Sequence, residues 1–175
     1  MATIYLGIGS NIERERYIIA GLDALQPLFG TLQLSPVYES DAIGFDGEPF
    51  LNLVARTETT LGVGALQKAL RHIEYEHGRP QHASRFSARQ LDIDILLYDD
   101  LVGNFDGVEL PRGEILDNAF VLRPLAELAP EAIHPATGTT YAELWQDYDA
   151  ASQPLRHTAL QWRGRPIGER CTPLD

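Results

Sequence analysis

Two kinds of hydrophobic spacing alternate along this chain, and their order is what most restricts its fold. In a strand, successive side chains point to opposite faces, whereas in a helix residues three or four apart share a face. Period-two alternation predicts four strands, at residues 3–9, 31–39, 50–60 and 91–98. Helical spacing predicts one helix that follows Ser10 or Asn11 as its N-cap and ends at Gly30, and a second at residues 64–78. The apolar positions of the first helix are Tyr17, Ile18, Leu22, Leu25 and Leu28.

The predicted order is strand, helix, strand, strand, helix, strand, which is the order of a ferredoxin-like α+β fold. A short hairpin near residues 102–110 and two C-terminal helices, at residues 119–128 and 141–148, are expected beside this core. The length of 175 residues suits one domain, which we place at residues 1–150. Residues 151–175 lose this periodicity and are expected to form a C-terminal extension of uncertain order.

Two aspartates open the fourth predicted strand. Asp92 and Asp94 are two residues apart, so both carboxylates should lie on one face of the strand, roughly 6.6 Å apart at about 3.3 Å per residue. Ile93 and Ile95 should point into the core. Magnesium prefers one or two carboxylates together with waters and substrate phosphates. Such a pair also occurs at solvated strand ends, so by itself it is a weak signal.

A group of arginines precedes the aspartates and strengthens that signal. The whole chain carries 14 Lys+Arg and 25 Asp+Glu. Residues 77–91 nevertheless hold Arg79, Arg85 and Arg89 and no acid. One guanidinium group can donate two parallel hydrogen bonds to a phosphate group. Cations beside a metal-binding carboxylate pair therefore predict phosphoryl transfer. The alternative for these arginines is an ordinary solvated loop, and Arg79 could simply complement the C-terminal dipole of the preceding helix.

Composition argues against several other classes of protein. The net charge of −11 disfavours nonspecific binding to nucleic acid. No apolar run approaches the ~18 residues of a membrane span, and no signal peptide is visible. The single cysteine, Cys171, has no internal disulfide partner, and the five histidines lack metal-ligand spacing. We therefore expect a cytoplasmic protein, a monomer without membrane or nucleic-acid partners.

Four motifs, in this order, resemble the 6-hydroxymethyl-7,8-dihydropterin pyrophosphokinase family of the folate pathway. They are residues 5–11, residues 35–52 with Ser-Pro-Val-Tyr-Glu-Ser and Pro-Phe-Leu-Asn, the Arg-to-Asp stretch at residues 85–96, and residues 110–130. The resemblance implies an enzyme that transfers pyrophosphate from ATP to the hydroxymethyl group of the dihydropterin and releases AMP. It also implies two Mg²⁺ ions, with ATP as co-substrate.

The resemblance assigns a role to each candidate residue. It implies catalytic roles for Asp92, Asp94, Arg85 and Arg89, with the two aspartates as metal ligands. Nucleotide contacts are implied for Arg71, Glu74, Arg79, Arg85, Arg89, Ile95 and Arg112. Pterin contacts are implied for Ser40, Ile43, Phe50, Asn52, Phe86, Asp92 and Phe120. Phe50 and Phe120 would stack on the two faces of the flat ring, although aromatic residues of this kind are more often part of the core. Arg71 and Glu74, three residues apart on a helix, could equally be a surface ion pair.

Departures from the family pattern concern the phosphate site. The family commonly has a histidine at Arg112, an arginine at Asn118, a cation in the hairpin near Gly107 and a tryptophan at Phe86. The triphosphate contacts should therefore depend more on Arg85, Arg89 and Arg112.

Two alternative functions follow from these departures and from the fold. A catalytically weakened pterin- or nucleotide-binding relative is the first, and the intact aspartate pair argues against it. The second is an RNA-binding domain, since such domains share the element order. That function requires a basic face and exposed aromatic residues on central strands. Tyr5 is the only candidate on the first strand, and the charge has the wrong sign.

Overall fold

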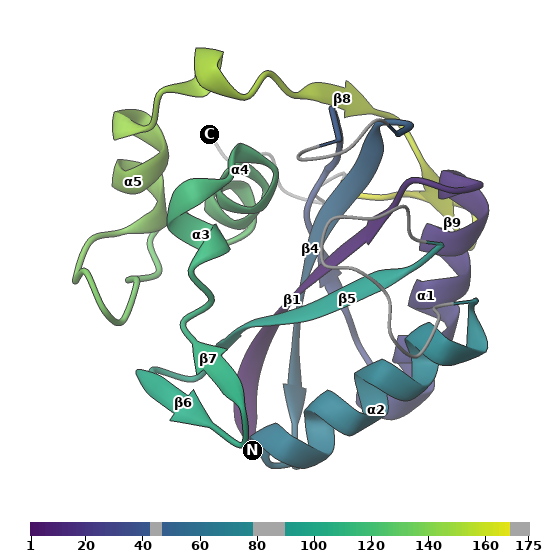
Figure 1. Cartoon of the computed structure of the whole chain (residues 1–175), viewed down its shortest axis with the longest axis horizontal. Coiled ribbons are helices and arrows are strands. Elements are labelled where there is room, and N and C mark those ends of the chain that lie inside the picture. Colours follow the sequence, from purple (N-terminus) through teal and green to yellow (C-terminus); the bar gives the residue numbers. More distant parts are fainter. Residues whose placement is uncertain (43–46, 79–89, 169–175) are drawn as a thin grey trace.

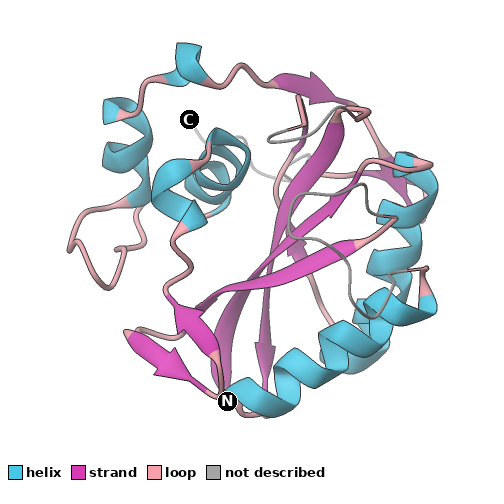
Figure 2. Cartoon of the chain, viewed as in Figure 1, coloured by secondary structure: helices cyan, strands magenta, loops and turns pink. Residues whose placement is uncertain are grey.

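A mixed α+β architecture is seen in the computed structural model, which describes residues 1–42, 47–78 and 90–168 (Figures 1 and 2). The main sheet has the strand order β5-β1-β4-β3-β8, and β2 also pairs with β4. The paired strands of this sheet are antiparallel. The four predicted strands thus take the order fourth, first, third, second, and the predicted ferredoxin-like fold is confirmed.

The elements of the N-terminal half are β1 (Ala2–Ser10), α1 (Arg14–Phe29), β2 (Gln33–Leu34), β3 (Val37–Ser40), β4 (Phe50–Thr59), α2 (Val63–Glu76) and β5 (Asp92–Tyr98). Those that follow are β6 (Gly103–Phe105), β7 (Val108–Leu110), α3 (Glu114–Asp117), α4 (Ala119–Leu128), α5 (Tyr141–Asp147), a 3-10 turn (Ala150–Ser152), β8 (Arg156–Thr158), β9 (Gln161–Trp162) and β10 (Arg165–Pro166). Among the described residues, no helix is long and apolar enough to cross a bilayer.

Alternating side chains divide the sheet between two cores. Ile4, Leu6 and Ile8 of β1 pack with α1 and α2 on one face. Tyr5 of the same strand packs with α3, α4 and α5 on the other face. Both sets of helices are visible on either side of the sheet in Figure 1. The sheet is therefore covered on both faces, and β5 is one of its edge strands.

Three local expectations were wrong. The predicted strand at residues 31–39 is divided into β2 and β3 around Pro36, whose nitrogen has no proton to donate. Ser35 Oγ there accepts a hydrogen bond from the Val54 amide at 2.8 Å. The first helix begins at Arg14 and not after Ser10 or Asn11. Ser10 Oγ donates to the Ile12 carbonyl and Asn11 Nδ2 to the Glu48 carbonyl, so both side chains serve the preceding loop.

The third wrong expectation concerns the apolar face of α1. Ile18, Leu22 and Leu25 are completely buried, whereas Leu28 is 50% exposed near the helix end. Gly30 does end the helix, with a positive φ of 79°.

The chain beyond residue 150 contributes short strands that periodicity did not predict. β8 pairs with β3 and extends the main sheet. β9 and β10 form a small ribbon, after which Ile167 is 7% exposed and joins the core beside α1. Trp162 Nε1 donates to Asp23 of α1 at 2.9 Å.

Two leucines of α1 give a matched test of this core. We expect Leu25→Ala to lower the free energy of unfolding by about 2–5 kcal/mol, because a fully buried side chain is lost. Leu28→Ala, one turn away and half exposed, should cost much less. Urea unfolding of both variants measures the difference, and equal losses would contradict the assigned helix face.

Candidate active site between two cavities

The site begins with the two aspartates at the start of β5. Asp92 and Asp94 are partly exposed on one face, while Ile93 and Ile95 between and after them are buried. The spacing therefore has the predicted effect on their orientation. Their register partners on β1 are Gly9 and Gly7, respectively, so no side chain from β1 covers the carboxylates.

Two cavities meet at this carboxylate pair. A cavity of about 500 Å³ is lined by Gln67, Arg71, Asp94, Ile95, Gly107, Val108, Glu109, Arg112, Gly113, Glu114 and Asp117. A smaller one of about 40 Å³ is lined by Gly7, Ile8, Gly9, Asn52, Leu53, Val54, Asp92, Asp94, Leu96, Arg112, Glu114, Phe120 and Val121. Asp94, Arg112 and Glu114 belong to both. The volume of the larger cavity lies in the range usual for ligand sites.

Arg112 is a described cation that lies beside one of the two aspartates. Its Nη2 lies 3.6 Å from Asp94 Oδ2 and 2.6 Å from Glu114 Oε1, and its Nε donates to the same Glu114 oxygen at 3.0 Å. Its backbone amide donates to the Leu96 carbonyl of β5 at 3.0 Å. Arg112 is thus fixed at the junction of the cavities, with part of its charge already balanced by Glu114.

Burial and repulsion shift the titration of Asp94. Its side chain is only 16% exposed. Loss of solvation is the main cause that raises the pKa of Asp94 to about 7, the charge of Asp92 adds to the rise, and Arg112 opposes it. A buried carboxyl group whose pKa is raised by a neighbouring carboxylate forms part of a site that a cation would stabilise.

Two carboxylates, Asp92 and Asp94, suit a magnesium ion that also binds water and substrate better than a metal ion that is coordinated by protein side chains alone. Within the described residues, no group of three or more His, Cys, Asp or Glu side chains is arranged to hold a metal ion. Magnesium commonly takes only one or two carboxylates and completes its coordination with waters and substrate phosphates. The residues present therefore fit Mg²⁺ only if the large cavity supplies phosphate oxygens.

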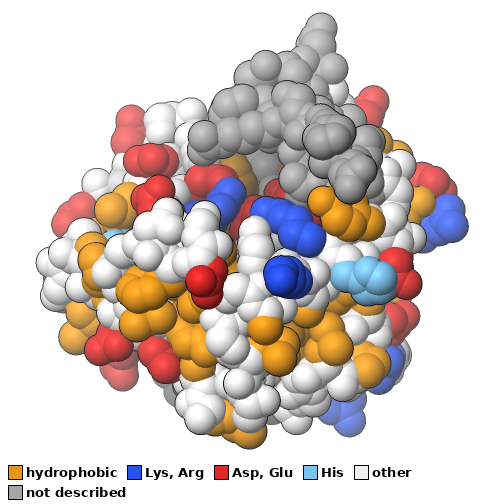
Figure 3. Space-filling model, turned by 60° about the horizontal axis from the view of Figure 1, so that its bottom comes forward, with side chains coloured by type: hydrophobic (Ala, Val, Ile, Leu, Met, Phe, Trp, Pro, Cys, Tyr) orange, Lys and Arg blue, Asp and Glu red, His pale blue; other side chains and the backbone are white. Residues whose placement is uncertain are grey.

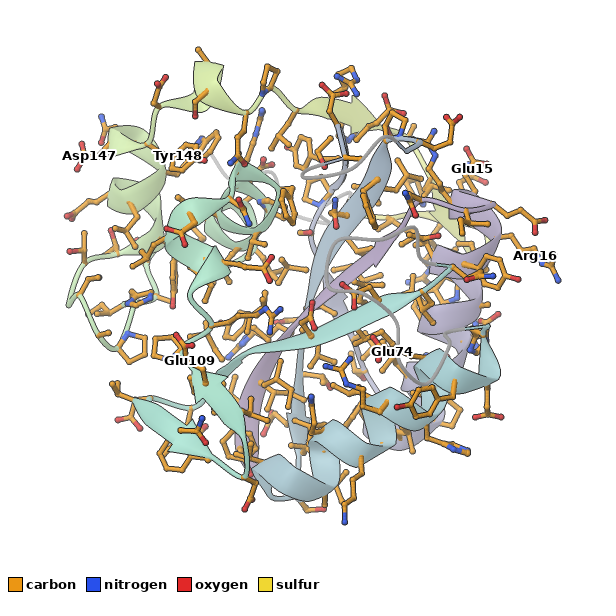
Figure 4. The ribbon with its side chains drawn as sticks, viewed as in Figure 1. Glu15, Arg16, Glu74, Glu109, Asp147 and Tyr148 are labelled. Atoms are coloured by element: carbon orange, nitrogen blue, oxygen red, sulfur yellow. The ribbon has the colours of Figure 1, made fainter. Side chains whose placement is uncertain are left out.

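Glu74 supports the strand that carries the aspartates. Its side chain is fully buried between α2 and β5, as Figure 4 shows. One carboxylate oxygen accepts from the Ile93 amide at 2.7 Å, and the other pairs with Arg71, which lines the large cavity. Its observed contacts hold β5 in place, and the expected contact with nucleotide stays a prediction.

Asn52 and Phe120 are two of the residues for which pterin contacts were expected, and the structure brings them together. Both line the small cavity, and Asn52 Nδ2 donates to Ser40 Oγ at 3.2 Å. A Cβ at Gly9 would lie 2.6 Å from Asn52 Oδ1, so a larger residue there would displace the Asn52 amide. At about 40 Å³ the cavity holds roughly one water and not a two-ring ligand, so its walls must shift to admit one. Phe50, at the start of β4, is half-buried and does not line this cavity.

Several predicted residues cannot be placed, and several lining residues were not predicted. Ile43, Arg79, Arg85, Phe86 and Arg89 lie outside the described residues. The lining residues that sequence reasoning missed include Gln67, Glu109, Gly113, Glu114 and Asp117. Glu114 could have been predicted, because an acidic residue two positions after a candidate site arginine, Arg112, is placed to pair with it. In Figure 3, Lys and Arg side chains gather near the centre of the face shown, with acidic and apolar side chains around them.

The fold and site define a ferredoxin-like α+β domain with a carboxylate pair at the junction of a cavity of about 500 Å³ and a smaller one that Phe120 lines. Residues 5–130 match the model of 7,8-dihydro-6-hydroxymethylpterin-pyrophosphokinase. The chain belongs to this family.

Two bacterial relatives resemble most of the chain. The 2-amino-4-hydroxy-6-hydroxymethyldihydropteridine pyrophosphokinase of Aquifex aeolicus is 37% identical over 137 residues, which cover 77% of this chain and 85% of the relative. The protein of the same name from Pseudomonas aeruginosa is 39% identical over 132 residues, covering 73% and 81%, respectively.

Longer proteins contain a similar region. The match to HPPK-DHPS from Plasmodium falciparum has a TM-score of 0.71 at 13% identity and covers 95% of this chain, which supports the fold. The chain spans 48% of that solved protein.

The raised pKa of Asp94 predicts how stability depends on pH. Between about pH 4 and pH 7 the folded state keeps a proton that the unfolded state releases, so wild-type stability falls as the pH rises through this range. Asp94→Asn cannot lose that proton. In EDTA, the variant should gain stability relative to wild type as the pH rises, measured by urea unfolding. Asp100→Asn, at an exposed position just after β5, is the control, and a wild-type/Asp94→Asn difference independent of pH would refute the shift.

Proposed function

We propose that this chain is an ATP-dependent diphosphokinase of folate biosynthesis that acts on 6-hydroxymethyl-7,8-dihydropterin. The hydroxymethyl oxygen attacks the β-phosphorus of ATP, the pyrophosphoryl group is transferred, and AMP leaves. Membership of the family supports this reaction. The structural observation that carries it is that Asp94 and Arg112 line both cavities, so groups bound in the two would meet beside the carboxylates. We retain a cytoplasmic location and a monomeric state as parts of the proposal.

We further propose that Asp92 and Asp94 hold two Mg²⁺ ions together with the phosphates of ATP. Bound there, magnesium supplies charge neutralisation at the reacting phosphate oxygens. The protein's own contribution is to keep two carboxylates on one face of β5 and to hold that strand through the Glu74–Ile93 hydrogen bond. Positioning of this kind accounts for much of the catalysis of phosphoryl transfer.

The lining of the large cavity supports binding of ATP together with its cations. Glu109, Glu114 and Asp117 add acid to a cavity that already contains Asp94. Among the described lining residues, only the guanidinium groups of Arg71 and Arg112 are positive. Free ATP would be repelled by such a surface, whereas a magnesium complex carries less negative charge.

On the pterin side, Phe120 is the aromatic group proposed to stack on the ring. The planar amide of Asn52 offers both a donor and an acceptor for the edge of the ring. Ser40, Ile43, Phe50 and Phe86 stay candidates for the remaining contacts.

One observation favours a second candidate, a weakened binding relative. Arg112 replaces a histidine usual in the family, and its guanidinium is already paired with Glu114. If this pairing leaves too little positive charge for phosphate, the chain would bind ligands without efficient turnover. Measurements of turnover and of the Arg112 contribution separate the two candidates.

Turnover is tested by incubating the protein with ATP, magnesium and 6-hydroxymethyl-7,8-dihydropterin and measuring AMP. Wild type should release AMP together with the pterin diphosphate. Asp92→Ala and Asp94→Ala should each lose about a thousandfold or more in rate, since several kcal/mol of charge stabilisation disappear with a metal ligand. Circular dichroism checks that the variants fold, and Asp100→Ala is the control. Wild-type turnover in either site variant at saturating magnesium would disprove the metal assignment.

Arg112 should contribute to nucleotide binding. We expect Arg112→Ala to raise the KM for ATP about tenfold to a hundredfold, because a charge-assisted contact is worth about 1.5–3 kcal/mol. Arg16→Ala, which removes an exposed arginine of α1, should leave ATP kinetics unchanged. Unchanged ATP kinetics in Arg112→Ala would remove Arg112 from the phosphate site without affecting the family assignment.

A further inference from the structure

A segment beyond the family match connects two parts of the pterin side of the site. We call residues Tyr148–Arg156 the C-terminal strap. It runs from the end of α5 to β8 and passes the N-terminal end of α4 (Figure 1). The family model ends at residue 130, so the strap is no part of that match.

The first end of the strap holds the junction between α3 and α4. The first amides of a helix have no partner within it, and the Asn118 side chain does not cap α4. Gln153 supplies the missing acceptor, because its Oε1 accepts from the Ala119 amide at 2.9 Å. Its Nε2 donates to the Asp117 carbonyl at 3.3 Å and to Asn118 Oδ1 at 3.2 Å.

Tyr148 reinforces the same junction. Its hydroxyl donates to the Asp117 carbonyl at 2.9 Å, and Figure 4 shows it at the end of α5 beside α4. Gln153 and Tyr148 therefore bind the three residues that immediately precede Phe120. These contacts hold the backbone directly before Phe120, and Phe120 itself lines the small cavity.

The second end of the strap holds the end of β3. Arg156 Nε donates to Glu39 at 2.7 Å and its Nη2 to Asp41 at 3.1 Å. Between these acids lies Ser40, which accepts the hydrogen bond from Asn52. The Arg156 pairs are exposed, and such pairs stabilise little on their own. The more specific contact of the strap is therefore that of Gln153.

We propose that Gln153 is a positioning residue for the dihydropterin substrate. By capping α4 it fixes the point from which Phe120 extends, while the other end of the strap holds the segment next to Asn52. The strap thus sets the spacing between the aromatic wall and the amide wall of the small cavity. This inference rests on the proposed function, and it predicts an effect on the pterin and not on ATP.

Steady-state kinetics of Gln153→Ala test the proposal. The KM for 6-hydroxymethyl-7,8-dihydropterin should rise roughly threefold to tenfold, the range expected from loss of a helix cap. The KM for ATP should stay within about twofold of wild type, because the side-chain hydrogen bonds of Gln153 join Asp117, Asn118 and Ala119, of which Asp117 alone lines the large cavity, and that bond is to its backbone carbonyl. The Kd of the dihydropterin, titrated with magnesium and α,β-methylene-ATP present, should rise by the same factor.

Matched variants make the result specific. Gln146→Ala, at an exposed position of α5, should behave as wild type, and Phe120→Ala gives the effect of losing the aromatic wall. If Gln153→Ala does not fold, Gln153→Met keeps the length of the side chain without its hydrogen bonds and carries the same expectation. A lower melting temperature with unchanged KM values, or equal rises for both substrates, would overturn the positioning role. Absence of AMP release by wild type would instead overturn the proposed function.

Discussion

Mutual repulsion between two carboxylates on one face of β5 is the constraint around which the site is organised. Asp92 and Asp94 share that face because the strand alternates, and burial strengthens their repulsion. Pairing with β1 and a hydrogen bond from the Ile93 amide to Glu74 of α2 hold the strand that carries them. Holding two carboxylates close together in a partly buried site costs electrostatic free energy, and a bound cation would lower that cost.

The sequence contained enough information for the fold and for the centre of the site. Alternating and helical spacing predicted the core elements because apolar residues recur at every second position of β1, β4 and β5, where they pack in one core with α1 and α2. The Asp92/Asp94 geometry followed from strand spacing alone. Periodicity failed where a local event decided the outcome, as at Pro36, or where a helix end left the core, as at Leu28.

The rest of the site depended on contacts between segments far apart in the chain. The pairing of Arg112 with Asp94 could not be deduced from composition, because it requires the chain after β7 to fold back beside β5. The strap is held by Gln153 and Arg156 through side-chain bonds across more than 30 residues, so it has no periodic signal. Polar contacts of this kind follow from tertiary structure and explain why the segment looked irregular in sequence.

The proposed reaction depends on a divalent metal that the carboxylate pair holds between a nucleotide and a pterin. A crystal grown with Mn²⁺, α,β-methylene-ATP and 6-hydroxymethyl-7,8-dihydropterin would test it through anomalous diffraction. We expect an anomalous peak roughly 2.1 Å from carboxylate oxygens of Asp92 and Asp94 and in contact with the phosphates. Metal bound only to the nucleotide, with both carboxylates turned away from it, would show that Asp92 and Asp94 are not metal ligands.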